Sequence, residues 1–321
     1  MKIINFNEPY ITGKEMEYIE DVFKQNKFYG ASKYTSLCED KIRNITGAKD
    51  ALLTDSCTAA LEIVALLLRD FTKKQEVIVP SYTFSSTASA FARAGFDIVF
   101  CEINETNMMI DVNDARAKIT NNTVAIVPVH YGGLSADIFG ICEIAKEFDL
   151  VVVEDCAQAF NSFLRNKHLG TFGDFGCFSF HETKNIHCGL GGALIINNDK
   201  YLDKARHIWE RGTNRQEVLK GLVDKYSWVE IGGSFYPTEI QAAFLLSQLE
   251  CLDDNLKKRQ IIYQAYYAGL IEKKKNNILH FPCVDKDFQT NYHAFFVIFP
   301  SELHADGVRQ HLVSHGVQAY I

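Results

Sequence analysis

Short, continuous runs of β-branched and aromatic residues recur along this chain, and they constrain its fold more than any other feature. Their apolarity does not alternate with polar residues, which indicates strands that are buried on both faces of a sheet. Helical patterns lie between many of these runs. The strand candidates occupy residues 76–79, 98–101, 124–127, 150–153, 176–180 and 193–196, and the helical patterns occupy 58–69, 85–94, 138–148 and 202–209.

This alternation predicts an α/β fold with a mostly parallel sheet flanked by helices. In open sheets of this kind, ligands bind beyond the carboxyl ends of the strands. The polar and aromatic side chains that follow the strand candidates are therefore expected to converge at one edge of the sheet. They are Tyr82, Thr83, Phe84, His130, Tyr131, Asp155, His181 and Lys184.

The character of the sequence changes after Thr238, so we expect a large α/β domain over residues 1–245 and a smaller α+β domain over 246–321. A long helical pattern from Thr238 to about Ile271 would bridge the two. The last strand candidate is unfinished at Ile321, so we expect the small domain to be incomplete. Beyond the bridge lie a strand candidate at 294–299, a helical pattern at 303–314 and the first residues of a strand at 317–321.

Composition argues against several kinds of partner. The formal net charge is -7 and no basic tract is present, so neither nucleic acid nor an anionic membrane is expected as a partner. The N-terminus has no apolar signal core and no run is long enough to cross a bilayer, which favours a cytoplasmic protein. The nine cysteines are scattered without a Cys-x-x-Cys pair, as is typical of reduced core thiols.

A metal site is not expected either. His181, Glu182, His187 and Cys188 lie close together in the sequence, but their spacing matches no zinc signature. A His-Glu-x-x-His motif would place its second histidine at position 185, which is Asn185.

Asp155 and Lys184 are the two residues that most strongly indicate a catalytic site. Asp155 follows one strand candidate and Lys184 lies just past the next. A lysine amine forms a Schiff base with the aldehyde of pyridoxal phosphate (PLP), and an aspartate pairs with the pyridine nitrogen and keeps it protonated. Taken singly, a solvated surface lysine and a turn or capping aspartate are the simpler interpretations. The pair, together with nearby Gln158 and Ser179, favours a PLP site.

A run of small residues, from Ser56 through Thr58 and Ala59 to Ala60, enters a helical pattern and could hold the cofactor phosphate. A helix N-terminus offers free N–H groups and the positive end of the helix dipole to an anion. The simpler interpretation is a helix cap without a ligand. Phe84 follows another strand candidate, where an aromatic ring could stack on the pyridine or belong to the core.

Together and in this order, these residues resemble the DegT/DnrJ/StrS family of PLP-dependent nucleotide-sugar aminotransferases. The resemblance runs from about Asn5 to the last residue, and it implies the fold-type I architecture of PLP-dependent transferases. The stretches that carry it are LLTDSCTA at 52–59, VPVHY at 127–131, GCFSFHETKN at 176–185, GTNR at 212–215 and VDKYSW at 223–228.

The resemblance also implies a role for each matching residue. Lys184 would be the Schiff-base lysine and the base that moves the proton, and Asp155 would pair with the pyridine nitrogen. Gln158 would contact the phenolic oxygen of the cofactor, and Phe84 would stack on its ring. The cofactor phosphate would be held by Thr58, Ala59 and Ser179, with Asn185 and Ser234 bordering it across a homodimer interface.

The implied reaction transfers the amino group of L-glutamate to C4 of a nucleotide-linked 4-keto-6-deoxy sugar for surface polysaccharide synthesis. The matching stretches are most similar to family members that convert dTDP-4-keto-6-deoxyglucose to dTDP-4-amino-4,6-dideoxygalactose. Lys184 argues against the sugar dehydratases of similar fold, because these tend to have histidine at that position.

Three departures from the family pattern leave a second hypothesis open. Leu190 stands in the glycine turn after the lysine, where many members carry an acidic residue. Ser234 stands where many have asparagine, and family chains normally continue well past Ile321. The chain could therefore be a PLP-binding protein without turnover, such as a regulator or a decayed paralogue. An aminotransferase for another keto sugar nucleotide is a further alternative.

Overall fold

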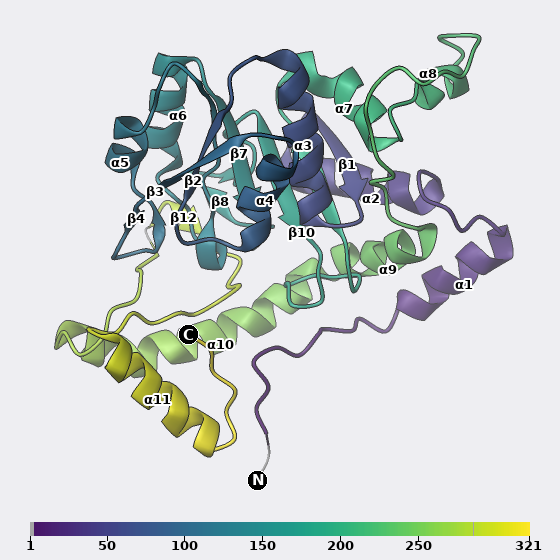
Figure 1. Ribbon diagram of the computed structural model, residues 1–321. Helices are drawn as coiled ribbons and strands as arrows, with labels where there is room; N and C mark the ends of the chain where they lie inside the picture. The colour runs from purple at the N-terminus through teal and green to yellow at the C-terminus, as the bar shows by residue number, and fades with distance from the viewer. Residues whose placement is uncertain (1–2, 285) are drawn as a thin grey trace.

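A seven-stranded sheet lies at the centre of the protein in the computed structural model, which describes residues 3–284 and 286–321 (Figure 1). β11 runs antiparallel to both of its neighbours, whereas the other six strands share one direction. The mostly parallel α/β sheet is thus confirmed. Its spatial order is β1 (Asp50–Thr54), β11 (Gly192–Ile196), β10 (Phe175–Ser179), β7 (Val151–Cys156), β6 (Thr123–Ile126), β2 (Glu76–Pro80) and β3 (Asp97–Cys101).

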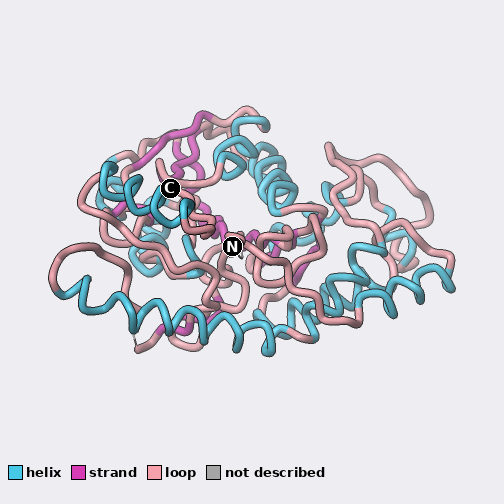
Figure 2. Tube along the Cα trace, turned by 90° about the horizontal axis from the view of Figure 1, so that it is seen from below, coloured by secondary structure: helices cyan, strands magenta, loops and turns pink. Residues whose placement is uncertain are grey.

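Helices cover both faces of this sheet (Figures 1 and 2). One face carries α3 (Cys57–Phe71), α4 (Ser85–Arg93) and α7 (Leu202–Trp209), which share one buried apolar cluster. The opposite face carries α1 (Glu15–Gln25), α2 (Lys33–Thr46), α5 (Val112–Ala117), α6 (Ile138–Phe148) and α9 (Glu239–Glu250).

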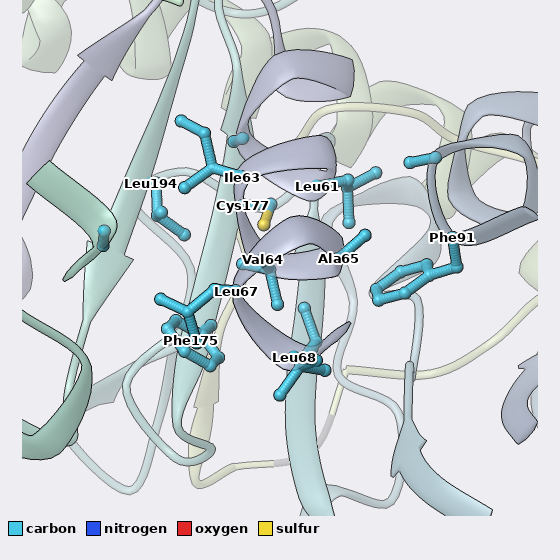
Figure 3. Packing of buried hydrophobic residues seen from close by; sticks show 14 of the residues in the cluster. Leu61, Ile63, Val64, Ala65, Leu67, Leu68, Phe91, Phe175, Cys177 and Leu194 are labelled. Atoms are coloured by element: carbon cyan, nitrogen blue, oxygen red, sulfur yellow. The ribbon is translucent and has the colours of Figure 1, made fainter. Parts of the chain in front are cut away.

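The strands are buried on both faces, as their continuous apolarity predicts. In β7, Val153 packs into the cluster beneath α3, whereas Val152 on the opposite face packs with α6. The helix α3 is apolar on most of its surface because it lies in the middle of its face of the sheet. Figure 3 shows the α3 side chains Leu61, Ile63, Val64, Leu67 and Leu68 with Phe91, Phe175, Cys177 and Leu194.

The bridging helix is interrupted, which corrects the prediction of one continuous helix from Thr238 to about Ile271. Helix α9 begins at a capping box made by Thr238 and Gln241, and α10 (Leu252–Lys275) follows it directly. Cys251, between the two helices, leaves helical geometry with φ -104° and ψ 17°. The break lets α9 stay on the sheet while α10 runs away from it (Figure 1). The expected domain boundary at 245/246 falls inside α9, and the division into two domains stays a prediction.

The strand predicted at residues 294–299 is absent. This segment is irregular and makes a single bridge, between Ile298 and His280. Its apolarity has another cause: Phe295 packs among the rings of Tyr263, Tyr266 and Phe281. An apolar, aromatic run indicates that the segment is buried, but it does not indicate what covers it. Here the segment packs against α10 and not within a sheet.

The predicted start of a strand at 317–321 is reduced to one parallel bridge, between Val317 and Ile4, after which the chain is irregular. The two ends of the chain therefore lie side by side (Figure 2). The helix predicted at 303–314 is confirmed as α11 (Glu302–Ser314). Small sheets complete the fold: β4 (Ile103–Asn104) with β5 (Met109–Ile110), and β12 (Phe288–Gln289) with β8 (Phe163–Leu164) and β9 (Lys167–His168).

The cysteines are all free, as expected, but they are not all core residues. Five are buried, whereas Cys283 is exposed. Within residues 3–284 and 286–321, we find no helix with both the length and the apolarity needed to span a bilayer.

Candidate active site

The candidate site lies at the edge of the sheet where the parallel strands end. There the chain leaves β1 at Thr54 and turns into α3, while β11 begins at Gly192 beside that turn. A Cβ atom placed on Gly192 would lie 2.3 Å from the carbonyl carbon of Ser56. Only glycine therefore lets β11 approach the start of α3 so closely.

The first turn of α3 offers unpaired backbone donors. Ser56 caps the helix, and its Oγ accepts a hydrogen bond of 3.0 Å from the Ala59 N–H. The N–H groups of Cys57 and Thr58 have no hydrogen-bond partner within the described part of the chain. They lie at the positive end of the dipole of a 15-residue helix, so this turn can bind a phosphate.

Asp155 is a buried carboxylate near the end of β7, only 4% exposed. Its Oδ2 accepts a hydrogen bond of 2.7 Å from the Thr87 hydroxyl, and its Oδ1 accepts one of 3.0 Å from the Ala157 N–H. Burial raises the pKa of Asp155, while these two bonds and the positive charge of Lys184 oppose the rise. A cation placed against this carboxylate would relieve the cost of burying it.

Lys184 lies in the loop after β10, in a turn that its own N–H closes by donating to the His181 carbonyl at 2.9 Å. Its side chain is partly buried. Burial lowers the pKa of the amine, and the neighbouring acidic groups Cys57 and Asp155 oppose that fall. The structure thus brings Lys184, Asp155 and the start of α3 together, with an amine that is less basic than an exposed lysine.

Three further predicted residues surround this pair. Gln158 accepts a hydrogen bond of 2.6 Å from the Gly132 N–H through Oε1. Ser179 ends β10 and is buried. Its Oγ accepts a hydrogen bond of 3.4 Å from the His181 N–H. Phe84, at the start of α4, is 77% exposed. An aromatic ring left open beside the Asp155 network is available to cover a flat ligand.

The sequence matches the DegT/DnrJ/EryC1/StrS aminotransferase family over residues 9–321. The chain belongs to this family. The GDP-perosamine synthase of Escherichia coli O157:H7 is 32% identical over 299 residues, which cover 93% of this chain and 78% of that protein. The GDP-perosamine synthase of Vibrio cholerae is 29% identical, over 97% of this chain and 82% of that protein. An X-ray structure of the aminotransferase from Psychrobacter cryohalolentis superimposes with a TM-score of 0.89, at 25% identity over 97% of this chain and 82% of that one.

Aminotransferases of this family act on sugars and use PLP. The residues of this chain fit that cofactor. The buried Asp155 suits a cationic ring nitrogen, and an amine of lowered pKa suits an aldehyde. The free N–H groups of the α3 turn and the Thr58 hydroxyl suit a phosphate, as does the close approach at Gly192. The expected cofactor and the fold-type I architecture are therefore confirmed for this aminotransferase.

One cluster of metal-ligand side chains exists among the described residues, formed by His130, Glu154 and Cys156 in the core behind the site. The ring nitrogens of His130 and the carboxylate of Glu154 are already bonded within the protein. His130 donates from Nε2 to Glu154 at 2.9 Å and accepts from the Ala136 N–H through Nδ1. Glu154 also accepts three backbone N–H bonds, from Gly170, Phe172 and Gly173.

His130 was expected at the open edge of the sheet, but this network holds its ring in the core. Only its backbone touches the site, by donating to the Asp155 carbonyl at 3.0 Å. Tyr82 and Tyr131 do meet beside the site, with hydroxyl oxygens 2.9 Å apart. The strand ends thus converge as predicted, with the His130 ring as the exception.

Asn185 is bonded to the C-terminal part of its own chain. It is 4% exposed, and both ends of its side-chain amide are bonded within the same chain. Nδ2 donates to the Asn291 carbonyl at 2.7 Å, and Oδ1 accepts from His293 Nδ1 at 2.9 Å. Burial and the charges of Lys184 and Arg259 hold the pKa of His293 well below its usual range, so that ring is neutral. Asn185 therefore anchors the loop of Lys184 within its own chain, and its role at a phosphate across a dimer interface stays a prediction.

Asn291 is the centre of this anchor, and no pattern in the sequence predicts its role. Its Nδ2 donates to the carbonyls of Gln158 and Phe160, at 2.8 and 2.9 Å. Gly133 leaves room for it, because a Cβ there would lie 2.0 Å from Asn291 Oδ1. One residue of the C-terminal part thus joins the loop of Lys184 to the loop of Gln158.

Ser234 precedes Phe235, whose carbonyl accepts a hydrogen bond of 2.8 Å from the Asp55 N–H, just before the first turn of α3. It forms a single antiparallel bridge with Glu210, where the chain returns from the projecting segment that includes α8 (Arg215–Leu219) (Figure 1). Its role at a phosphate depends on a second chain and stays a prediction.

We predict that Asn185→Ala destabilises the aminotransferase without PLP, because it leaves His293 Nδ1 and the Asn291 carbonyl unpaired. Each buried polar group left unpaired costs about 1–3 kcal/mol. Urea denaturation measures the loss, with Asn113→Ala, an exposed asparagine on α5, as a control that should stay within about 0.5 kcal/mol of the parent. A loss that disappears when the chain is diluted to a monomer would instead assign Asn185 to an interface.

Proposed function

We propose that this aminotransferase moves the amino group of L-glutamate to C4 of a nucleotide-linked 4-keto-6-deoxy sugar. The observation that carries the proposal is the meeting of a buried carboxylate, Asp155, a partly buried amine, Lys184, and the unpaired first turn of α3 at one sheet edge. Membership of a family of sugar-nucleotide aminotransferases supports the choice of substrate class.

When bound, PLP supplies an electron sink that stabilises the negative charge left on carbon by proton removal. Asp155 would keep the ring nitrogen protonated, with Gln158 and Phe84 fixing the plane of the ring. Lys184 would hold the cofactor and, once released, carry a proton on Nζ. Because burial lowers the pKa of this amine, more of it is in the base form near neutral pH than for an exposed lysine.

The phosphate would be held by Thr58 and Ala59 in the first turn of α3 and by Ser179 at the end of β10. The Ala59 N–H is already bonded to Ser56, so Ala59 would act mainly by shaping the turn. Ser234 would approach the phosphate of the partner protomer, which makes the proposed enzyme a homodimer with shared sites.

The sugar substrate could be linked to either of two nucleotides, dTDP or GDP. The stretches that match at 52–59 and 223–228 favour dTDP-4-keto-6-deoxyglucose, with dTDP-4-amino-4,6-dideoxygalactose as product. The relatives named GDP-perosamine synthase favour an amino sugar carried on GDP instead. We retain the dTDP sugar as the proposed substrate and the GDP-linked 4-keto-6-deoxy sugar as the alternative.

A PLP-binding protein without turnover is the competing function, motivated by Leu190 in the turn after the lysine. In the structure the Leu190 side chain is exposed, and its carbonyl accepts a hydrogen bond of 3.0 Å from Gln241 Nε2. This turn is therefore tied to the start of α9 through its backbone. An amino transfer from glutamate alone, without any sugar, separates the two functions.

We predict that the enzyme with PLP and L-glutamate releases 2-oxoglutarate, and that dTDP-4-keto-6-deoxyglucose is then aminated at C4. Mass spectrometry and NMR of the product identify the sugar, with the GDP-linked substrate in a parallel reaction. Amination of the GDP sugar alone would correct the nucleotide. Bound PLP with no 2-oxoglutarate formed would support the protein without turnover.

We predict that borohydride traps the cofactor on Lys184, because this is the amine of lowered pKa next to Asp155. Lys184→Ala should take up no covalent label, as read by peptide mapping, and Lys273→Ala, an exposed lysine on α10, serves as a control. Asp155→Ala should lower the rate of the glutamate reaction about 100-fold or more, because the ring nitrogen loses its counter-charge. A label on another lysine would refute the assignment of the site.

We predict a homodimer formed through the segment from α8 to Ser234, which projects from the sheet (Figure 1) and exposes large apolar residues. Trp228 is 75% exposed and Ile231 67% exposed, as expected of a surface that a second copy covers. The double variant Trp228→Asp/Ile231→Asp should sediment as a monomer and bind PLP more weakly. Leu303→Asp on α11 is the matched control, and a fully active monomeric parent would contradict the shared site.

A further inference from the structure

A pair of threonine hydroxyls stands behind Asp155, on the first turn of α4 and in the segment before it. Thr87 is fully buried, and its Oγ1 lies 2.7 Å from Asp155 Oδ2. Thr83 lies one helical turn earlier, and its Oγ1 lies 2.7 Å from that of Thr87. The three side chains form a series of hydrogen bonds from the segment before α4, through the first turn of α4, to the buried end of β7.

The hydrogens in this line can run in only one direction when Asp155 is ionised. A carboxylate accepts hydrogen bonds and donates none, so the Thr87 hydroxyl must donate to Asp155. The Thr87 oxygen then accepts, which makes Thr83 the donor to Thr87. Hydroxyls aligned in this way polarise one another and strengthen the bond to the carboxylate.

The other oxygen of Asp155 is held as firmly. Asp155 Oδ1 accepts a bond of 3.0 Å from the Ala157 N–H, so each carboxylate oxygen has one donor from a different element. Each oxygen keeps a further lone pair for a ligand, since a carboxylate offers about four acceptor positions. The carboxylate plane is thereby fixed by α4 on one side and by the end of β7 on the other.

A purely structural role for Thr87 is the simpler interpretation, because threonine in a helix often bonds to the carbonyl four residues earlier. The structure differs from that pattern. The Thr87 hydroxyl bonds to a residue 68 positions away in another element, and that residue is the proposed partner of the cofactor ring. Valine has nearly the same shape as threonine, so packing alone would not select a hydroxyl at position 87.

We propose that Thr87, supported by Thr83, is a positioning residue that holds Asp155 as an oriented anion toward the cofactor ring nitrogen. The inference rests on the proposed role of Asp155. Without the Thr87 donor the buried carboxylate loses a charge-assisted bond and takes up a proton more readily. A protonated Asp155 pairs poorly with a cationic ring, so the ring nitrogen would lose its proton as well.

The test compares Thr87→Val with Thr87→Ser in the 321-residue protein, because valine removes the donor and serine keeps it. Two readouts other than activity are used: the Kd for PLP, and the 15N chemical shift of the pyridine nitrogen in labelled PLP. We expect Thr87→Val to weaken PLP binding about 10- to 100-fold, the usual worth of a hydrogen bond to a charged group. Its 15N shift should move toward that of an unprotonated pyridine.

Thr87→Ser should match the parent in both readouts, and Thr83→Val should move both less than Thr87→Val and in the same direction. If Thr87→Val fails to fold by circular dichroism, Thr87→Cys takes its place, because a thiol is a weak donor of similar size. Its expected values lie between those of the parent and those of a variant without the donor.

The outcomes separate this inference from the proposed function. If the parent protein does not attach PLP to Lys184, the proposed function fails and Thr87 has no cofactor to position. If the parent attaches PLP, and the folded valine or cysteine variant has the parent's Kd and 15N shift, the role of Thr87 is overturned. A weaker Kd with an unchanged 15N shift also overturns it, since that result means only a change of packing.

Discussion

A carboxylate buried beside an amine is the constraint on which the rest of this structure depends. A charge in the core is stable only where donors and an opposite charge compensate it. Asp155 receives its donors from α4 and from the loop after β7, and its opposite charge from Lys184 after β10. Strands β7 and β10 must therefore be neighbours, and they are, with Asp155 paired in register with Cys177. The order of strands in the sheet thus places the ends of β7 and β10 side by side.

Much of this could be predicted because the signals are local. A continuous apolar run marks each central strand, and a polar residue at its end marks the edge where ligands bind. Asp155 and Lys184 were found in this way. β1 (Asp50–Thr54) was not predicted as a strand, because its central residues, Ala51, Leu52 and Leu53, are neither β-branched nor aromatic. Thr87 could have been predicted as a neighbour of the site, because it lies four residues after Thr83, on the side of the helix that faces the sheet.

The remaining features depend on contacts between distant segments, which no local pattern reports. Asn291 lies in an irregular segment, and its importance comes from carbonyls more than 130 residues away in the sequence. The same limit explains Asn185. Its bonds to Asn291 and His293 join segments more than 100 residues apart, and no pattern around position 185 indicates them. The aromatic segment 294–299 was mistaken for a strand because apolarity records burial without saying what covers it.

The anchor at Asn291 also sets an order in which the molecule can be completed during synthesis. The ribosome delivers the sheet, α3 and the loop of Lys184 first, and these can pack as soon as they emerge. The carbonyls of Gln158 and Phe160 and the amide of Asn185 have no partner from this anchor until residue 291 follows. The loops around the lysine can therefore acquire this anchor only after residue 291 has been made.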